Sequence, residues 1–454
     1  MKGHAFFYLG IVMELEAIAL LMPATLSAAT GDGAFTLFAA AAIASFAIGT
    51  ALHRSFPRGP LSFGSLMALS ALSYLSASLF GAIPYLGSLS AQDAIFESVS
   101  GFTATGMTAA VPEALPASLL LWRSFSQWLG GLGALAVFAL LTPAGGISSY
   151  HFYGAGWSER LEPANARGAV TVGMIYLSYT ALGAALFVIA AVPPFEAALL
   201  SMSSVSTGGF STRSGTLAAF GSPYVACAAF VLMVLGSTSF LLHRGLWKGR
   251  LRHYASNPEA RAFWALILAS ILVLALAGQD AFGSAFLAVS ALSGTGYQIA
   301  APAGLAVAVA ALLVTVGGMS GSTSGGMKLI RAIAAARGGH WYMKKLALPR
   351  SAIIPLRIGT VFIKQPQIKE ILAFAALYLA FLGASAAFLA YSGYAASDSL
   401  LQAASALGNA AFSPIPPASM TLTVKAVLAL GMLAGRLEIF PLLALLMLSA
   451  RAMK

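Results

Sequence analysis

Residues 93–107 read DAIFESVSGFTATGM, a run that begins at an acid, ends beside Gly106 and lies between two long apolar stretches. Three later segments repeat this arrangement around Gly208, Gly296 and Gly408, with the local sequences STGGF (206–210), SGTGY (293–297) and ALGN (406–409). A residue without a Cβ atom adopts positive φ at little cost, so glycine lets successive backbone carbonyls turn toward one axis and replace the water around a cation. The four segments therefore predict a four-part ion pore.

The composition indicates a polytopic membrane protein. Of the 454 residues, 59% are hydrophobic and 9% are charged, and the mean hydropathy is +0.85. So few charges cannot solvate a globule of this size. The net charge of +11 comes from Lys and Arg residues dispersed between apolar stretches, which argues for membrane topology and against nucleic-acid binding. The single cysteine, Cys227, lies in an apolar run and can form no internal disulfide.

Ten apolar segments are long enough to cross a hydrocarbon layer of about 30 Å. The first follows Lys2 without a cleavage signature, so we expect it to be retained as a helix. An even number of crossings puts both termini on the same side. The spans are expected at 5–27, 34–52, 66–86, 118–141, 169–192, 223–242, 262–277, 304–336 with an interruption, 371–390 and 422–447.

The basic residues predict the orientation of the chain. Most of them fall on one face: Lys2, Arg54, Arg58, Arg160, Arg167, those within 244–261 and 328–369, Arg451 and Lys454. The positive-inside rule makes this face cytoplasmic. We therefore expect a multi-pass protein of a bacterial or archaeal cytoplasmic (inner) membrane, with both termini in the cytoplasm and the four glycine segments on the outer side.

Each glycine segment follows a run of roughly ten to sixteen residues, which is too short to span a bilayer and must therefore re-enter and leave on the same side. We predict an all-α polytopic membrane protein. Four pseudo-symmetric repeats, each of span, re-entrant pore loop and span, surround a central pore after two extra transmembrane helices. The expected units are 1–61 (N-terminal helix pair), 62–150, 168–245, 260–345 and 366–454 (pore repeats one to four).

An acid stands near the start of each short run, at Asp93, Glu196, Asp280 or Asp398. It would stabilise the positive end of a helix whose negative C-terminal end points to the membrane centre and favours a cation there. Each acid alone is most simply an N-cap. Together the four could form a ring that concentrates cations at the outer mouth.

The eighth span is interrupted by residues 317–328, which read GGMSGSTSGGMK. So many helix breakers should unwind the span into a loop that faces the protein interior or the pore, on the cytoplasmic side of the filter. We interpret this loop as a gate, and the alternative is a close-packed Gly/Ser helix contact. A phosphate-binding loop is excluded because Met327 intervenes before Lys328 and Leu329 replaces the required Ser or Thr.

Arg436, Glu14 and Glu16 are further ionisable residues within spans. Arg436 in the last span either contacts the gate loop or faces ions in the cavity, or it pairs with Glu438 or reaches the membrane surface. Glu14 and Glu16 in the first span are expected near the inner surface, and no partner can be named for them. These alternatives remain open from the sequence.

No catalytic motif competes with the pore, so we predict that the chain is not an enzyme. HExxH and GxSxG patterns are missing from the sequence. All histidines are expected in solvated tails or loops: His4, His53, His151, His243, His253 and His340. The remaining alternative is a Na⁺- or H⁺-coupled secondary transporter of a small solute, although such transporters are typified by two broken helices in inverted halves.

Nearly the whole chain resembles the Trk/Ktr/HKT superfamily of potassium transporters, and most closely its TrkH branch of membrane subunits. The motifs that carry the resemblance are DAIFES (93–98), WRS (122–124), QWLGG (127–131), STGGFSTR (206–213), GSTSGGMK (321–328) and GRLEIF (435–440). Their order and spacing together are specific. The extra helix pair before the first repeat resembles TrkH rather than the shorter Ktr subunits.

The resemblance implies potassium uptake through a gated, channel-like pore in a homodimer, regulated by a cytosolic TrkA-like ring that binds the nucleotide. No covalent cofactor is expected, and K⁺ is the transported ion. The implied filter, acting mainly through backbone carbonyls, comprises Thr103, Ala104, Thr105, Gly106, Ser206, Thr207, Gly208, Gly294, Thr295, Gly296, Leu407, Gly408 and Asn409. The implied gate comprises Gly317, Gly318, Ser320, Gly321, Ser322, Thr323, Ser324, Gly325, Gly326, Lys328 and Arg436.

The chain departs from the family pattern at several filter positions. The first segment has Ala104 and Met107, the third has Gly294 where threonine is usual, and the fourth has Leu407 before its glycine. These changes keep the backbone carbonyls but remove side-chain hydroxyl ligands. A glycine at Gly106, where sodium-transporting plant relatives carry serine, favours potassium.

Overall fold

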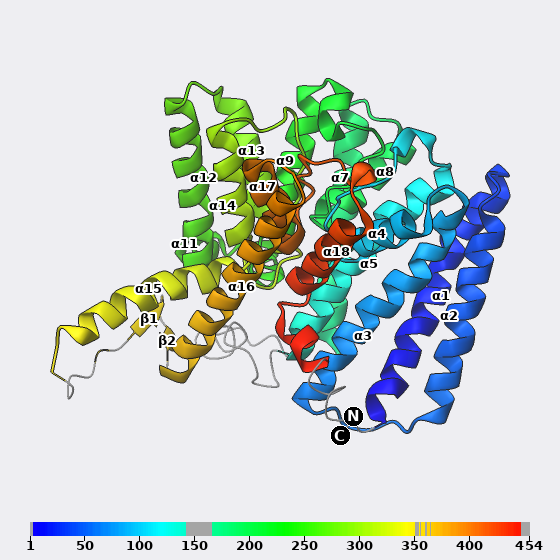
Figure 1. The fold of residues 1–454 in the computed structure, drawn as a ribbon, viewed down its shortest axis with the longest axis horizontal. Coiled ribbons are helices and arrows are strands. Elements are labelled where there is room, and N and C mark those ends of the chain that lie inside the picture. The colour runs from blue at the N-terminus through cyan, green and yellow to red at the C-terminus, as the bar shows by residue number, and fades with distance from the viewer. Residues whose placement is uncertain are drawn as a thin grey trace.

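The computed structural model describes residues 3–141, 166–349, 354, 356–358, 361–363 and 365–445. A helix pair, α1 (His4–Thr30) and α2 (Phe35–Ser55), comes first, and four groups of helices follow (Figure 1). Lys2, Arg160, Arg451 and Lys454 of the expected basic face lie outside the described residues.

Each of the four groups begins with a long helix, continues with a short helix and returns with a further helix. The first two groups comprise α3 (Phe63–Ala82), η1 (Ile83–Gly87), α4 (Ala91–Phe102), η2 (Pro112–Ala114) and α5 (Ala117–Leu141), then α7 (Ala166–Ile189), α8 (Pro194–Val205), η3 (Thr216–Phe220), α9 (Pro223–Ser237), α10 (Phe240–Trp247) and α11 (Leu251–Ser256). The last two comprise α12 (Pro258–Leu276), α13 (Ala281–Ser293), α14 (Leu305–Val316) and α15 (Leu329–Leu346), then α16 (Gln365–Tyr391), α17 (Ala396–Gly408), η4 (Pro417–Ser419) and α18 (Leu422–Arg436).

Within the described residues, six helices are long and apolar enough to cross a membrane, or seven if the bent pair α9 and α10 counts as one span. Their outward faces carry exposed apolar side chains, such as Leu15 (60% exposed), Ile43 (70%) and Leu272 (61%). Serine and threonine side chains are buried instead, among them Ser100, Ser203 and others at the ends of the short helices. This distribution suits lipid outside and polar groups inside.

The short helices α4, α8, α13 and α17 have 12, 12, 13 and 13 residues. At 1.5 Å per residue each is about 18–20 Å long, less than the roughly 30 Å of a hydrocarbon core. All four lie in the upper half of Figure 1. Four short helices are therefore present where the sequence predicts them, and they lie on one side of the molecule.

The acids at the starts of these helices have different partners. Asp280 is the N-cap of α13 and accepts from the backbone N–H of Gly283 at 2.6 Å. Asp93 lies in the first turn of α4 and pairs with the Lys425 amine at 2.5 Å. Glu196 lies in the first turn of α8 and pairs with Arg213 at 3.0 Å. Ion pairs neutralise two of the four acids, so the expected ring of free carboxylates is wrong at Asp93 and Glu196.

Two expected spans are broken. Residues 223–242 were expected as one span, but α9 ends at Ser237 and α10 leaves at an angle of 106°. The last span ends at Arg436, where Glu438 and Ile439 adopt positive φ (61° and 64°) before a further helical turn begins. The break after Ser237 frees backbone groups that bond to residues 319–323. The apolar composition of the two stretches does not reveal either break.

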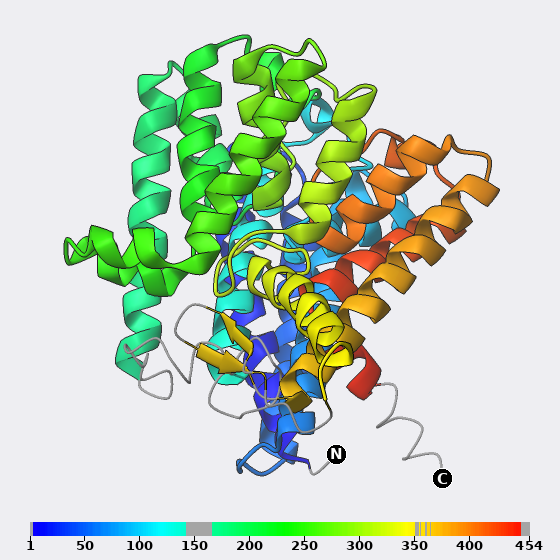
Figure 2. The ribbon, with the colours of Figure 1, turned by 90° about the vertical axis from the view of Figure 1, so that its left-hand side faces the viewer.

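The segment between α15 and α16 contains an antiparallel pair, β1 (Leu356–Ile358) and β2 (Val361–Ile363), with Leu356 opposite Ile363. The sequence did not predict this hairpin. It packs with α15 and the start of α16 around Ile330, Ile358 and Ile368 (Figure 2). The rest of the described chain is helical or irregular, as expected for an all-α membrane protein.

The helix pair α1 and α2 packs closely because a Cβ atom at Gly10 would lie 2.5 Å from the Gly49 carbonyl oxygen. Glu14 bonds to Thr50 at 3.1 Å and to His53 at 3.2 Å, whereas Glu16 is buried and accepts from Ser45 at 3.4 Å. Both acids thus have partners on α2, which the sequence could not name, and α2 covers Glu16.

His243 was expected to be a solvated loop histidine, and this expectation is wrong. It lies in α10 and is fully buried. Its two ring nitrogens contact the Tyr179 hydroxyl at 2.8 Å and the Leu235 carbonyl at 2.8 Å. The bend between α9 and α10 folds this histidine back against the helix end.

Candidate functional site

The segments that follow the four short helices meet one another. A Cβ atom added to Gly106 would lie 2.0 Å from the carbonyl oxygen of Gly208, and one added to Gly209 would lie 1.9 Å from that of Thr295. A Cβ atom at Gly296 would lie 2.1 Å from the backbone nitrogen of Ala411. Backbone segments from all four groups thus approach within distances that only glycine allows.

Two of the four glycines that were predicted to adopt positive φ do not adopt it. The first segment has positive φ at Ala104 (52°) and Gly106 (85°), and the third has it at Gly294 (76°) and Gly296 (74°). The second segment has positive φ at Thr207 (54°) and Gly209 (77°), not at Gly208. In the fourth, Asn409 has positive φ (51°) and Gly408 is the last residue of α17.

Positive φ falls on Gly209 and not on Gly208 because of the position at which the short helix ends. The Ser100 carbonyl accepts from the Thr105 N–H at 2.9 Å, and the Ser203 carbonyl accepts from the Gly208 N–H at 2.8 Å. Gly208 therefore corresponds to Thr105, and the following Gly209 corresponds to Gly106. Two adjacent glycines in the second segment made this register ambiguous from the sequence.

The helices α4, α8, α13 and α17 end directly before these segments. The C-terminal end of a helix carries a partial negative charge of about half an elementary charge. Among the described residues no group of three or more His, Cys, Asp and Glu side chains could hold a metal ion. A cation at this place would therefore meet backbone carbonyls and helix dipoles.

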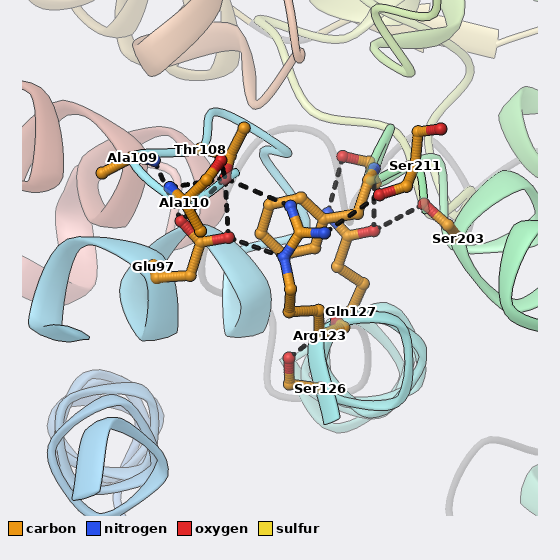
Figure 3. Close-up of polar contacts among 11 residues, drawn as sticks. Glu97, Thr108, Ala109, Ala110, Arg123, Ser126, Gln127, Ser203 and Ser211 are labelled. Carbon is orange, nitrogen blue, oxygen red and sulfur yellow. Dashed lines mark hydrogen bonds and ion pairs between the residues drawn. The ribbon is translucent and has the colours of Figure 1, made fainter. Parts of the chain in front are cut away.

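A buried ion pair stabilises the first segment and lies outside the region in which the four segments meet. Nε of Arg123, on α5, lies 2.7 Å from Oε1 of Glu97, on α4, and both side chains are almost fully buried (Figure 3). Glu97 also accepts from the Thr108 hydroxyl at 2.9 Å and from the Ala109 N–H at 3.0 Å. Arg123 donates to the carbonyl of Ser211 at 2.9 Å. This network joins the first segment to the second.

Gln127, one turn after Arg123 on α5, holds the second segment. Its Nε2 donates to the Gly208 carbonyl at 2.7 Å, and its Oε1 accepts from Ser203 Oγ at 2.6 Å and from the Phe210 N–H at 3.2 Å (Figure 3). The Tyr297 hydroxyl donates to the Phe210 carbonyl at 3.0 Å, which joins the third segment to the second. The oxygen and one N–H of the Gln127 amide are thus hydrogen-bonded to the backbone and to Ser203.

The fourth segment joins the first through Asn409. Its Nδ2 donates to Thr105 Oγ1 at 3.0 Å and to the Met432 carbonyl at 2.8 Å. A Cβ atom at Gly435 on α18 would lie 1.9 Å from the Leu407 carbonyl oxygen, so α18 approaches the end of α17 closely. Of the predicted filter residues, these contacts bring together Thr105, Gly106, Gly208, Thr295, Gly296 and Asn409.

Glu113, which follows the first segment, links the loops after the first and second segments. It accepts from the backbone N–H and the hydroxyl of Ser214 at 2.6 and 2.7 Å. Slight burial raises the pKa of Glu113, but the hydrogen bonds from Ser214 outweigh that effect and lower the pKa below its ordinary value. Glu113 therefore stays ionised at neutral pH.

The interrupted eighth span is an unwound loop, as predicted. Residues 317–328 separate α14 from α15 and are all buried. Gly317, Gly321 and Gly326 have positive φ of 71°, 71° and 78°. A regular Gly/Ser helix contact is thereby excluded, because no helix runs through these residues.

The break in the sixth span bonds to this loop. The Met319 N–H donates to the Ser237 carbonyl at 3.1 Å, and the Thr323 N–H donates to the Gly236 carbonyl at 3.2 Å. In return the Phe240 N–H donates to the Gly321 carbonyl at 2.9 Å. Non-helical backbone at membrane depth needs such partners, so the two interruptions satisfy each other.

Arg436 contacts the loop, which decides between the alternatives left open by the sequence. Its guanidinium donates to the Thr323 carbonyl at 2.6 Å and to the Gly130 carbonyl of α5 at 2.9 Å. Glu438 pairs with Arg331 of α15 instead. Thr207 Oγ1 lies 3.3 Å from Thr323 Oγ1, so Thr323 also contacts the second segment.

Glu259 anchors the two ends of the loop, a role that sequence reasoning missed. Its carboxylate, at the start of α12, is buried and accepts from the Ser320 N–H at 2.9 Å and from the Ile330 N–H at 3.1 Å. The Lys328 amine donates to the Ser324 carbonyl within the loop. An acid in the first turn after Asn257 reads as an ordinary helix start, and its partners are 61 and 71 residues away.

Comparison with known proteins agrees with this architecture. Residues 73–275 and 262–451 match the TrkH family, described as cation transport proteins. The chain is 30% identical to an uncharacterized cation transporter of Methanocaldococcus jannaschii, over 96% of this chain and 94% of that protein. It is also 30% identical to the Trk system potassium uptake protein TrkH of Halomonas elongata, over 96% of each chain.

A solved structure extends the similarity to three dimensions. The crystal structure of the potassium transporter TrkH from Vibrio parahaemolyticus superposes with a TM-score of 0.89 at 27% identity, covering 98% of this chain and 99% of that one. The family consists of transport proteins, in line with the prediction that the chain is not an enzyme. The chain belongs to the TrkH family of cation transport proteins.

Proposed function

We propose that this chain takes up potassium ions across the cytoplasmic membrane through a pore lined by the four segments that follow α4, α8, α13 and α17. The observation that carries the proposal is their mutual approach, since Gly106, Gly209 and Gly296 each admit no Cβ atom. Backbone carbonyls gathered at the C-terminal ends of short helices replace the hydration shell of a cation. The potassium transport named for the Halomonas and Vibrio relatives supports K⁺ as the ion.

The pore proposed here is built from residues 62–150, 168–245, 260–345 and 366–454, after a helix pair at 1–61. It includes the filter residues expected from the sequence, with Gly209 added as the counterpart of Gly106. The loop at 317–328 and Arg436 form the gate on the inner side. Their support is the buried contact between Thr323, Thr207 and Arg436.

We further propose both termini in the cytoplasm, a homodimer in the bilayer, and control by a cytosolic TrkA-like ring that carries the nucleotide. The support for the ring is the name of the relatives, which belong to a Trk system. The described basic residues of the inner face would be its docking surface, including Arg244 and Lys248 at the end of α10 and Lys344 and Lys345 on α15.

The test is uptake in a bacterial strain without its own potassium transporters. Cells that express this chain should grow at low external K⁺ and take up K⁺ faster than Na⁺. Collapse of the Na⁺ or H⁺ gradient at constant membrane potential should leave uptake unchanged. Loss of uptake under that treatment would favour an ion-coupled secondary transporter, and absence of any K⁺ uptake by well-expressed protein would overturn the proposal.

A serine at Gly209 is expected to lower the K⁺ to Na⁺ uptake ratio roughly tenfold or to abolish uptake. Its Cβ atom would lie 1.9 Å from the Thr295 carbonyl oxygen, and the residue has a φ of +77°. Gly215→Ser is the matched control, because Gly215 has a φ of +79° with nothing within 4 Å of an added Cβ atom. Equal selectivity of Gly209→Ser and the wild type would contradict the filter assignment.

A further inference from the structure

We propose that Ala411 determines ion specificity in this chain, because its methyl group occupies the filter position at which the other three segments carry bare glycine. The proposal rests on the pore proposed above and names a residue that the expected filter set did not include. Ala411 is then the position at which the fourth segment differs from the other three, whereas the sequence had pointed to Leu407 and Gly408.

The register of the fourth segment follows from its helix end. The Ser405 carbonyl accepts from the Ala410 N–H at 2.8 Å, as Ser100 accepts from Thr105 and Ser203 accepts from Gly208. Ala410 is therefore the counterpart of Thr105 and Gly208. Ala411 is then the counterpart of Gly106 and Gly209.

The third segment is aligned by its backbone angles, because its hydrogen bond differs: the Ser290 carbonyl of α13 accepts from the Gly296 N–H, six residues on, at 3.2 Å. Positive φ occurs at Gly294 and Gly296 as it does at Ala104 and Gly106, so Gly296 is the counterpart of Gly106. Gly106, Gly209 and Ala411 also come six residues after Ser100, Ser203 and Ser405. The position six residues after the helix serine thus reads Gly, Gly, Gly and Ala.

Ala411 touches its counterpart in each of the other three segments. Its Cβ atom lies 2.7 Å from a Cβ atom built at Gly106 and 2.5 Å from one built at Gly209. The backbone nitrogen, Cα and carbonyl carbon of Ala411 lie 2.1, 2.6 and 2.8 Å from a Cβ atom built at Gly296. A residue in contact with three segments lies where the four of them meet, and Ala411 is only 6% exposed there.

The methyl group changes this position in two ways. Gly106, Gly209 and Gly296 have φ between 74° and 85°, whereas Ala411 is not among the residues with positive φ. Its carbonyl therefore cannot repeat the orientation of the other three. The Cβ atom itself takes up space without offering a ligand, so an ion at this level meets fewer oxygens and a narrower passage.

The expected consequence is a filter that discriminates less between K⁺ and Na⁺ and admits large cations poorly. The number of carbonyl dipoles around the ion and the width of the passage both enter potassium selectivity. Removing the methyl group should increase the number of carbonyl dipoles around the ion and widen the passage.

The experiment measures initial uptake of Na⁺, K⁺, Rb⁺ and Cs⁺ by the full-length wild type and by Ala411→Gly. The K⁺ to Na⁺ and Cs⁺ to K⁺ uptake ratios should each rise about three- to tenfold, the change expected for one added polar contact. Ala411→Val should lower uptake of all four ions, and of Cs⁺ most. Ala68→Gly is the matched control, since it makes the same exchange at a fully buried position of α3, outside the four segments, and should leave the ratios unchanged.

A second measurement does not depend on flux. The melting temperature of purified Ala411→Gly in detergent should rise more steeply with KCl than that of the wild type, since the ion stabilises the state that binds it. Wild-type ratios and a wild-type KCl dependence in a folded Ala411→Gly variant would overturn the role of Ala411 and leave the proposed potassium uptake standing. If the wild type prefers another cation and Ala411→Gly still shifts the ratios, potassium uptake fails and the role of Ala411 stands.

Discussion

Arg123→Met is expected to destabilise the protein by about 3–5 kcal/mol, the usual cost of leaving one partner of a buried ion pair alone. Glu97 would keep its carboxylate in a buried site without the guanidinium that lies 2.7 Å away. The Ser211 carbonyl of the second segment would lose its donor as well. We therefore expect a sharp drop in the thermal unfolding temperature in detergent and loss of ion uptake.

Two variants control this prediction. Arg213→Met breaks an ion pair with Glu196 whose side chains are 37% and 22% exposed, so it should cost about 1 kcal/mol or less. The double variant Glu97→Gln and Arg123→Met removes both buried charges and should recover part of the lost stability. An Arg123→Met protein as stable as Arg213→Met would show that the Glu97 pair does not support the filter.

Arg436→Met is expected to raise potassium uptake in the absence of any regulatory partner by about tenfold or more. Arg436 bridges the Thr323 carbonyl of the gate loop and the Gly130 carbonyl of α5. Hydrogen bonds to a charged group contribute about 1.5–3 kcal/mol each, and 1.4 kcal/mol changes an equilibrium between closed and open states tenfold. Without this bridge the loop is released from the position below the filter.

Uptake by membrane vesicles that contain the purified chain measures this basal flux directly. Arg337→Met is the control, because Arg337 is exposed on α15, after the loop, and bonds to the Arg357 carbonyl. Basal uptake equal to or below that of the wild type, in Arg436→Met protein that is folded and inserted, would refute the gate.

The short helices and the interrupted span were predictable from the sequence because both follow from local composition. A run of about a dozen residues cannot cross a bilayer, and a stretch of Gly, Ser and Thr at 317–328 cannot remain helical. The breaks after Ser237 and Arg436 were not predicted, since each lies within a stretch that is long enough and apolar enough on average to be a continuous span. The backbone groups freed after Ser237 find partners in the loop at 317–328.

The contacts that hold the site were also beyond the sequence. Glu97 and Arg123 are 26 residues apart, and Gln127 reaches Gly208 across 81 residues. From the sequence, Gly208 and Gly209 are equally plausible filter glycines, and only the backbone φ angles distinguish them. The hydrogen bond at the end of α17 and the close approach to three glycines reveal Ala411, which nothing in its local sequence distinguishes from Ala410.

The sequence by itself determined the class of the molecule: a polytopic α-helical membrane protein with four short helices, each leading into a glycine-containing segment, and an unwound eighth span. Hydropathy and helix propensity are local quantities, so they can be read along the chain. The tertiary structure alone decided which carbonyls face one another, that Arg436 holds Thr323, and that Ala411 stands opposite three glycines. Those relations depend on how four distant segments pack, and packing at the level of single Cβ atoms is set only when all four are in place.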